Sequence, residues 1–529
     1  MTAPRYFITT TIPYVNGDPH IGHAEEFAQT DAFGRYHRLR GDDTYVLTGT
    51  DENSLKNVQA AEREGIPTED LVERNSLKFK ELADALRFDY DQFIRTSVDP
   101  RHVAACQKLW RAVQANGDIY KKHYRGLYCV GCERFYDEDE LIDGLCPEHR
   151  TPPQPVEEEN YFFRLSRYGE ALRELIASDR LLVLPDFRKN EVLSFVSRGL
   201  EDFSISRSYE RARGWGVPVP DDPTQVMYVW FDALTNYISA LGYDSETELY
   251  RQYWLDNPVR VHALGKGVIR FHAVYWPTML LSAGVPLPAT EFVHGYINIA
   301  GGKMSKSLGN VIDPAALVTE YGAEAVRYFL LRGVSPTRDA DFADVNHFHD
   351  QLRARYTADL ANDLGNLVNR VVTLVGRNCD GKVPAAGSRG ELERSVEELA
   401  ARVPMAVAEA MDRYDPQSAL AAIWDLVKRT NLYLEETKPW ELAKAARAGE
   451  SASAERLRTS LYTAAETVRL VAALLEPFLP ATAPRIREQM GVTETAESWT
   501  DRLRWGLLAP DTEVARPEPL FPRLELAAG

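Results

Sequence analysis

A short motif near the N-terminus carries side chains that suit the phosphates of a nucleotide. Pro19-His20-Ile21-Gly22-His23 lies between a strand-like segment and a helical one. The free N–H groups at a helix N-terminus attract phosphate, and two imidazoles spaced i, i+3 can donate to its oxygens. Gly22 lets a flat base approach the backbone. Two surface histidines at a helix start would be the plainer explanation of this motif.

A second motif offers two cations on a glycine-flanked loop. Lys303-Met304-Ser305-Lys306-Ser307 follows Gly301-Gly302. Two lysines there can hold a triphosphate and neutralise charge as pyrophosphate departs. On its own the segment would be an ordinary solvated basic loop. The two motifs together, in this order, are far more specific than either alone.

Four soft ligands occur at metal-binding spacing in the middle of the chain. Cys129 and Cys132 form a Cys-x2-Cys pair, and Cys146 and His149 form a Cys-x2-His pair thirteen residues later. Such a set closes a tetrahedral Zn²⁺ site with no open position. We predict one structural zinc ion, whose binding contributes folding energy to this segment.

The elements around the first motif follow the order strand, helix, strand, helix. Residues 5–11 and 43–49 are short runs of β-branched and aromatic residues, and 21–39 is helical in pattern. The same rhythm resumes with strands predicted at 225–230 and 259–264. This order is typical of a doubly wound parallel sheet, whose ligands bind at the carboxyl ends of the strands.

The fold class predicted is α/β: a doubly wound, parallel (Rossmann-type) catalytic domain, split by a zinc-knuckle insertion and followed by an all-α helical bundle. Amphipathic stretches near 352–377, 389–412, 416–437 and 453–475 predict the bundle. The predicted units are 1–118 (first half of the catalytic domain), 119–223 (insertion), 224–290 (second half), 291–350 (connector with the lysine loop) and 351–529 (helical domain).

Composition excludes several classes of protein. No run of about 18 apolar residues exists, which excludes a spanning helix. Five cysteines, three of them within 129–146, argue for a reducing, cytoplasmic location over a disulfide framework. The net charge of −17 gives no support to non-specific nucleic-acid binding and confines any RNA contact to one face.

With both nucleotide motifs in place, the chain resembles the class I aminoacyl-tRNA synthetases. In that family the first motif contacts ATP and the lysine loop stabilises the transition state of adenylation. The resemblance implies that ATP binds with Mg²⁺ and that His20, His23, Lys303 and Lys306 are catalytic. It adds Gly22, Gly265 and Ser305 to the ATP site.

The aromatic residues near the strand ends resemble the methionine pocket of methionyl-tRNA synthetases. Aromatic edges pack well on a polarizable thioether, although any one of these residues would ordinarily be core. The insertion is also too short for the large editing domain of the valine, isoleucine and leucine enzymes. The resemblance implies that Asp51 pairs with the substrate ammonium. The implied methionine site is Ile12, Tyr14, Asp51, Trp230, Ala233, Tyr237, Phe271, His272 and Trp276.

The resemblance extends into the helical region. There it implies that Trp440 stacks on an anticodon base and that Arg377 reads base edges. For a lone Trp, packing between helices would be the simpler expectation. The function implied is that of a methionine–tRNA ligase, which activates L-methionine with ATP and transfers it to the 3'-terminal ribose of tRNA(Met).

Two segments depart from the family pattern. Gly-Thr-Asp-Glu-His-Gly is here Gly49 to Ser54 with Asn53 in place of His, and Gly-Lys-Asp ends here in Gly267. These departures keep two alternatives open: a paralogue that adenylates an amino acid for a non-tRNA acceptor, and a non-catalytic tRNA-binding regulator. The chain ends without the dimerising module of some relatives, so a monomer is predicted.

Overall fold

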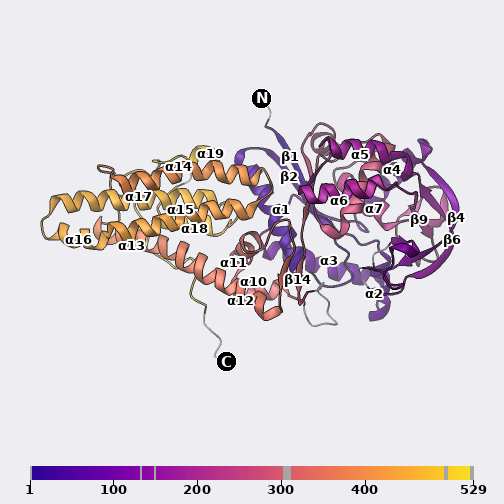
Figure 1. Cartoon of the computed structure of the whole chain (residues 1–529), viewed down its shortest axis with the longest axis horizontal. Coiled ribbons are helices and arrows are strands. Elements are labelled where there is room, and N and C mark those ends of the chain that lie inside the picture. The colour runs from indigo at the N-terminus through magenta and orange to yellow at the C-terminus, as the bar shows by residue number, and fades with distance from the viewer. Residues whose placement is uncertain (1–2, 132–133, 148–149, 302–310, 494–497, 525–529) are drawn as a thin grey trace.

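Six parallel strands form the central sheet of this computed structural model, which describes residues 3–131, 134–147, 150–301, 311–493 and 498–524 (Figure 1). Every neighbouring pair is parallel, and the order is β3-β2-β1-β12-β13-β7. The chain runs outward from β1 in both directions, which makes the carboxyl end of β1 the switch point of the sheet. The doubly wound fold class is therefore confirmed. The strands are β1 (Arg5–Thr9), β2 (Asp43–Thr50), β3 (Gln92–Arg95), β7 (Leu182–Leu184), β12 (Arg260–Gly265) and β13 (Thr290–His294).

Both faces of this sheet are buried. Side chains alternate along each strand, so each strand contributes to a core on either face. Tyr6 and Ile8 of β1 point into one core and Phe7 into the other. The first core contains α1 and α3 and continues into the C-terminal bundle, whereas the second contains α4 to α7 and α9. The helices of this part are α1 (Ile21–Arg40), α2 (Leu55–Glu64), α3 (Thr68–Ala85), α4 (Pro100–Ala115), α5 (Gly169–Ala177), α6 (Asp186–Ser197), α7 (Val229–Ser239), α8 (Glu248–Tyr250) and α9 (Trp276–Ala283).

The prediction of a central-sheet strand at 225–230 is wrong in two respects: the strand ends at Met227, and it belongs to a different sheet. The strand β11 (Asp222–Met227) belongs to a small antiparallel sheet with β9 (Ser206–Ser208) and β10 (Pro218–Val219), and Trp230 already lies in α7. A short apolar run fits a buried helix as well as a buried strand, so the pattern could not separate the two.

The insertion forms an antiparallel sheet at the end of the molecule farthest from the bundle (Figure 1). Its main feature is a long hairpin in which Ile119 to Tyr128 pair with Phe163 to Gln154. One short strand of the predicted insertion, β7, instead extends the central sheet beside β13. The four strands of the insertion are β4 (Ile119–Cys129), β5 (Arg134–Tyr136), β6 (Gln154–Phe163) and β8 (Phe203–Ser204).

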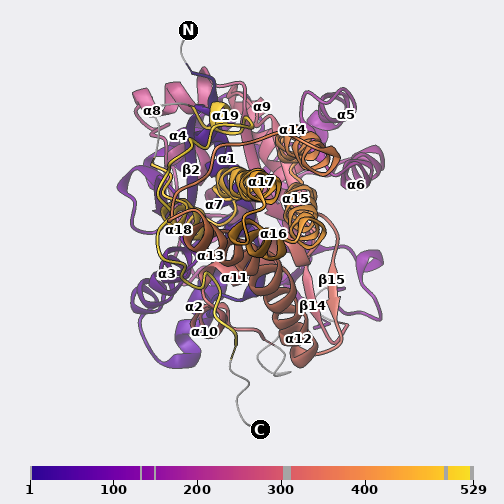
Figure 2. The same cartoon turned by 90° about the vertical axis from the view of Figure 1, so that its left-hand side faces the viewer.

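A connector leads from the sheet to an elongated helical bundle (Figures 1 and 2). It contains β14 (Ile297–Ile299), which pairs in parallel with β15 (Ala340–Phe342). The helices are α10 (Pro314–Tyr321), α11 (Ala323–Tyr328), α12 (Val345–Arg355), α13 (Asn366–Asn378), α14 (Glu391–Met411), α15 (Pro416–Thr437), α16 (Pro439–Arg447), α17 (Ser451–Leu475), α18 (Thr482–Gln489) and α19 (Trp499–Arg502).

Helix α1 joins the two halves of the molecule. Its N-terminus lies at the switch point, and its later turns contact the connector and the bundle. Asp31 forms a fully buried ion pair with Arg327, with the nitrogen and oxygen 2.6 Å apart. Arg327 also donates a hydrogen bond to the carbonyl of Phe478. One turn from the end of the helix, the hydroxyl of Tyr36 donates to Asp412 at 3.0 Å. The phosphate motif and the bundle are thus held by one rigid element.

Among the residues that the structure describes, no helix combines the length and apolar character needed to cross a bilayer.

Candidate active site and RNA-binding bundle

A cavity of about 550 Å³ opens at the carboxyl ends of the central strands, next to the start of α1. Thr11 follows β1, Gly265 ends β12 and His294 ends β13, so three strands converge on it. The site residues predicted from the sequence that line this cavity are Ile12, Tyr14, His20, Gly22, His23, Trp230, Ala233, Tyr237, Gly265, Phe271 and His272.

The two histidines of the first motif cap α1 and stack on each other. Their ring centroids are 3.8 Å apart. The Nδ1 of His20 accepts from the backbone N–H of Gly22 at 3.2 Å, and the Nδ1 of His23 accepts from that of His20 at 3.1 Å. Because each Nδ1 is an acceptor, a neutral ring carries its proton on Nε2. Both side chains therefore present an N–H donor beside a helix N-terminus, as anion binding requires.

Gly22 is needed for this arrangement. A Cβ atom at residue 22 would stand 3.1 Å from Cε1 of His20. Any side chain at residue 22 would push the His20 ring by a few tenths of an ångström from its capping position.

The aromatic end of the cavity is built on α7 and on a π-helical turn. Trp230 of α7 stacks on Phe271 with ring centroids 3.8 Å apart. Phe271 and His272 lie in the π-helical turn Phe271–Tyr275, an irregularity that is frequent at functional sites. The two segments, far apart in sequence, form a flat apolar wall.

A buried hydrogen bond adds polarity to this wall. The hydroxyl of Tyr237 lies 2.7 Å from Nε2 of His272, whose Nδ1 lies 3.0 Å from the carbonyl of Val268. A carbonyl can only accept, so Nδ1 carries the proton and Tyr237 donates to Nε2. Burial lowers the pKa of His272 to about 4, which keeps the ring neutral at pH 7.

Two residues of the predicted methionine site are not part of the cavity lining that the structure describes. Asp51 is buried, forms a β-bridge with Tyr14 and accepts from the N–H of Asn53 at 3.2 Å. Trp276 is buried behind Tyr237, with ring centroids 6.2 Å apart. Each contacts a residue of the lining, and their roles toward a substrate stay predictions.

An ion pair that the sequence analysis did not predict lies in the cavity wall. Nε2 of His294 lies 2.8 Å from Glu26, which also accepts from the backbone and side chain of Thr11. Burial opposes charge on His294, but the hydrogen bond to Glu26 and the Glu26 charge outweigh it and raise the pKa of His294 to about 9. The cavity wall thus contains an imidazolium at pH 7. Its place at the carboxyl end of a strand was the one available signal.

The departures from the family pattern have structural reasons. Ser54 is the N-cap of α2, where its hydroxyl accepts from the N–H of Lys56 at 3.1 Å. At Gly267 the hydroxyl of Tyr296 fills the space of a side chain, since an added Cβ would stand 1.9 Å from it. The preceding Lys266 binds Asp339 at 2.5 Å and lies over the Tyr296 ring.

The lysine loop is not part of the described structure. Lys303, Ser305 and Lys306 lie outside the described residues, whereas Asn298 before them and Val311 after them line the cavity.

Half of the predicted metal site is described. Cys129 and Cys146 are buried in one small cluster with Tyr136 at the tip of the insertion. Cys132 and His149 lie outside the described residues. The two described thiols fit a soft-metal centre because they lie together, shielded from water. Gly131, which follows Cys129 by two residues, lines the cavity, so this tip borders the active site.

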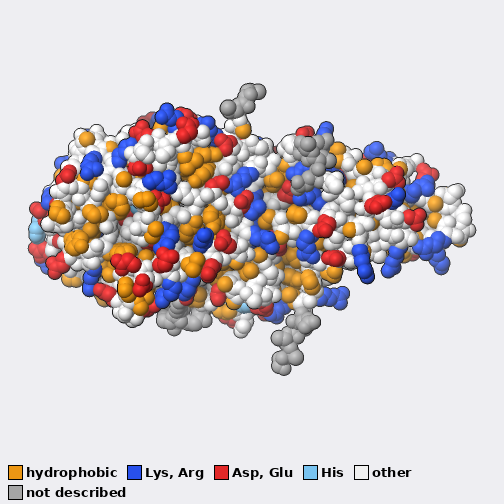
Figure 3. Space-filling view, turned by 180° about the vertical axis from the view of Figure 1, so that it is seen from behind, with side chains coloured by type: hydrophobic (Ala, Val, Ile, Leu, Met, Phe, Trp, Pro, Cys, Tyr) orange, Lys and Arg blue, Asp and Glu red, His pale blue; other side chains and the backbone are white. Residues whose placement is uncertain are grey.

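In the bundle, Trp440 opens α16 with 41% of its surface exposed. The guanidinium carbon of Arg370 lies 5.6 Å from the centre of its ring, and Arg370 also binds Glu435 at 2.8 Å. Arg377 stands two turns further along α13 and is exposed. The residue paired with the tryptophan is therefore Arg370, which the sequence did not single out. Lys and Arg side chains also gather along the lower edge of the bundle end in Figure 3.

The comparisons with known proteins agree with this architecture. The sequence matches a family described as "tRNA synthetases class I (M)" over residues 6–154 and 149–372. It matches "Anticodon binding domain of methionyl tRNA ligase" over residues 383–527. The chain belongs to the methionyl-tRNA synthetase family. The resemblance inferred from the sequence motifs is thereby confirmed.

Individual relatives match over almost the whole chain. A methionine–tRNA ligase of Brucella suis is 44% identical over 99% of this chain and 98% of its own length. One of Bacillus subtilis is 41% identical over 98% of this chain and 78% of its own length. A structure of Mycobacterium tuberculosis methionyl-tRNA synthetase in complex with methionyl-adenylate superimposes with a TM-score of 0.92, at 42% identity, over 98% of this chain and 100% of that one.

Proposed function

We propose that this protein is a methionine–tRNA ligase that forms methionyl-adenylate from L-methionine and ATP and then transfers methionine to the 3'-terminal ribose of tRNA(Met). The observation that carries the proposal is one cavity in which two kinds of wall meet. The stacked imidazoles at the N-terminus of α1 border one side, and the Trp230–Phe271 wall with its Tyr237–His272 pair borders the other.

The chemistry is an in-line displacement at phosphorus. A methionine carboxylate oxygen attacks the α-phosphorus of ATP, the bond to the bridging oxygen breaks, and pyrophosphate leaves with its Mg²⁺. Nothing covalent is required of the protein, which positions the reactants and neutralises charge. In this proposal the Nε2–H groups of His20 and His23 donate hydrogen bonds to the phosphates. Lys303 and Lys306 neutralise the charge on the departing pyrophosphate.

Methionine recognition rests on the neutral His272. Tyr237 donates its hydroxyl proton to Nε2 of His272, so the hydroxyl oxygen can accept a hydrogen bond from a ligand but has no proton left to donate to one. We assign the thioether to the neighbourhood of this pair and of Trp230, with Ile12, Tyr14, Ala233 and Phe271 around it. Asp51 serves the ammonium group, directly or through Tyr14.

One zinc ion supports the insertion in our proposal, bound by Cys129, Cys132, Cys146 and His149. When bound, it supplies no reaction chemistry but ties the tip of the insertion together. Since Gly131 lines the cavity, the same tie fixes part of the active-site wall.

The helical domain, residues 351–529, is the anticodon-binding unit in this proposal, with Trp440 as a stacking platform. Arg370 stands against that ring and, with Arg377, completes the basic contribution of α13. We also propose a cytoplasmic monomer, which size-exclusion chromatography with light scattering will test.

The deciding experiment is aminoacylation of total tRNA by the purified protein with labelled methionine and ATP. We expect charging that Lys306→Ala abolishes. Lys382→Ala, a surface lysine of the bundle that pairs with Glu513, is the matched control and keeps activity. Pyrophosphate exchange without charging would favour the alternative of a non-tRNA acceptor, and tRNA binding without exchange would favour the regulator.

A further inference from the structure

Helix α7 is attached to the molecule on the side that faces away from the cavity. Trp230, Ala233 and Tyr237 line the cavity from one face of this helix. Asp232 and Ser239, seven residues apart, lie on the opposite face, because two residues correspond to about 200° of helical rotation. Both are buried, and neither lines the cavity.

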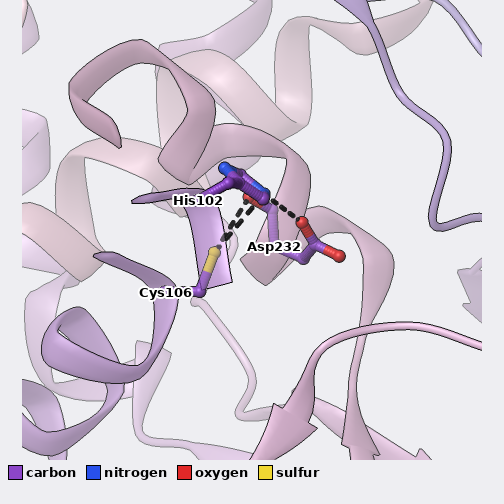
Figure 4. Close-up of side chains that lie close together, drawn as sticks. All are labelled: His102, Cys106 and Asp232. Atoms are coloured by element: carbon purple, nitrogen blue, oxygen red, sulfur yellow. Dashed lines mark hydrogen bonds and ion pairs between the residues drawn. The ribbon is translucent and has the colours of Figure 1, made fainter. Parts of the chain in front are cut away.

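One imidazole holds both of these residues. His102 of α4 is fully buried against α7. Its Nε2 lies 2.5 Å from Oδ1 of Asp232, and its Nδ1 lies 2.7 Å from Oγ of Ser239 (Figure 4 shows the contact with Asp232). The ring therefore spans two turns of α7, from the turn that carries Trp230 to the turn that carries Tyr237.

Asp232 depends on this contact. Its second oxygen, Oδ2, is buried and has no hydrogen-bond partner among the described residues. A buried carboxylate without a partner is costly. Removing the imidazole would leave Asp232 to find new partners by shifting the first turn of α7, and Trp230 would shift with it.

We propose that His102 is a positioning residue for the methionine pocket, which it keeps in shape by holding α7 through Asp232 and Ser239. The inference rests on the proposed function, because it concerns affinity for methionine. His102 touches no substrate, and it acts through the helix that carries Trp230, Ala233 and Tyr237.

A metal centre is the competing explanation for the same cluster. The thiol of Cys106 lies 3.5 Å from Nε2 of His102, and these two residues with Asp232 offer a His, a Cys and a carboxylate (Figure 4). The distance of 2.5 Å between imidazole and carboxylate is that of a hydrogen bond. Two ligands of a tetrahedral ion stand farther apart than this. We therefore favour the hydrogen-bonded arrangement.

The test is the KM for methionine and for ATP in pyrophosphate exchange. We expect His102→Ala to raise the methionine KM about tenfold, the effect of losing one charged hydrogen bond, while the ATP KM changes less than about twofold. His102→Gln, whose amide replaces Nε2, retains the Asp232 contact and restores most of the affinity. His102→Asn, whose amide replaces Nδ1, restores less.

The matched control is Val113→Ala, three turns along the same helix and equally buried. It destabilises α4 by loss of apolar contact and leaves both KM values unchanged. An equal rise in methionine KM in Val113→Ala and His102→Ala would overturn the proposal, and so would an unchanged KM in His102→Ala. If His102→Ala does not fold, Ser239→Ala and His102→Gln decide, with an expected rise of two- to threefold in the former.

Zinc content per chain separates the metal explanation. A zinc equivalent that is present in the wild type and absent from Cys106→Ser would overturn the proposal in favour of a metal centre. Absence of methionine-dependent exchange in the wild type would instead refute the proposed function, which is a different outcome from exchange with unaltered KM in the variants.

Discussion

The hydroxyl oxygen of Tyr296 lies 1.9 Å from the point where a Cβ atom on Gly267 would stand. Tyrosine and glycine are therefore complementary at this wall of the cavity, which both residues line. The ring is held in place by Lys266, whose Nζ lies 4.8 Å from its centre. The missing aspartate of the family pattern is thus no simple loss, because another polar group occupies its space.

This complementarity predicts a suppressor relationship. Gly267→Ala forces the Tyr296 ring out of place, and we expect the ATP KM to rise about tenfold, in line with the cost of overpacking. Tyr296→Phe removes the clashing oxygen, since the next ring atom is 3.2 Å from the added Cβ. The double variant is therefore expected to bind ATP as well as Tyr296→Phe alone. Additive losses in the double variant would contradict the relationship.

The ion pair between His294 and Glu26 predicts a pH dependence of stability. The pKa of His294 is raised to about 9, so folding favours the protonated ring. The resulting stabilisation is complete below the unfolded pKa of about 6.5 and is lost as pH rises toward about 9. The lost free energy of unfolding amounts to roughly 3 kcal/mol. Urea unfolding at pH 6 and pH 9 measures it, and His294→Gln is expected to remove this part of the difference while the part that Glu25 contributes remains.

Glu25 provides the control for this prediction. Burial raises its pKa to about 8, so its ionisation also removes stability, in this case as pH rises from about 4.5 through about 8. Glu25→Gln eliminates that contribution and leaves most of the one from His294, because Glu26 raises the pKa of His294 more than Glu25 does. A profile of Glu25→Gln that is already flat between pH 6 and 9 would show that Glu25 alone causes the loss.

The contact between Arg370 and Trp440 predicts which arginine serves tRNA binding. We expect Arg370→Ala to raise the KM for tRNA about tenfold, because a lost stacking or charged contact costs 1–3 kcal/mol. Methionine-dependent pyrophosphate exchange is expected to remain unchanged. Arg370→Lys retains the charge without the planar guanidinium, and its KM for tRNA is expected to lie between those of the wild type and Arg370→Ala. A larger rise in the KM for tRNA in Arg377→Ala than in Arg370→Ala would contradict this prediction.

Metal analysis is expected to find one zinc ion per chain, lost in Cys146→Ser. The insertion then loses folding energy, and its melting temperature falls. Because Gly131 lines the cavity, the KM for ATP or methionine is expected to rise as well. Cys379→Ser, a cysteine of the bundle outside this cluster, is the control and retains the metal. Full zinc content in Cys146→Ser would contradict the ligand assignment.

Sequence patterns predicted the long elements and the motifs better than the short elements. The strands predicted at 5–11, 43–49 and 259–264 correspond to β1 (Arg5–Thr9), β2 (Asp43–Thr50) and β12 (Arg260–Gly265), whose apolar residues pack on both faces of the sheet. The edge strand β7 has only three residues, and its pairing with β13 depends on distant parts of the chain. No local pattern could assign it.

The same distinction holds for the site. The position of His20 and His23 at a helix start beside the cavity could be predicted because it depends on a local turn. Glu26, His294 and Arg370 were not predicted, because each is placed by a contact with a residue more than sixty positions away in the sequence. Asp51 and Trp276 came from the family resemblance, and the structure shows each in contact with a residue of the cavity lining, Asp51 with Tyr14 and Trp276 with Tyr237, so their roles toward a substrate stay predictions.

Helix α1 has a consequence for dividing this protein into parts. Arg327 donates to Phe478 of the C-terminal half and pairs with Asp31 in α1, with both charges fully buried. A truncation before the bundle would deprive the guanidinium of one acceptor and open the core that α1 shares with the helices. The catalytic half is therefore not a self-sufficient module. An exchange of bundles between relatives is expected to succeed only if the incoming bundle supplies acceptors for Tyr36 and Arg327, as Asp412 and the carbonyl of Phe478 do here.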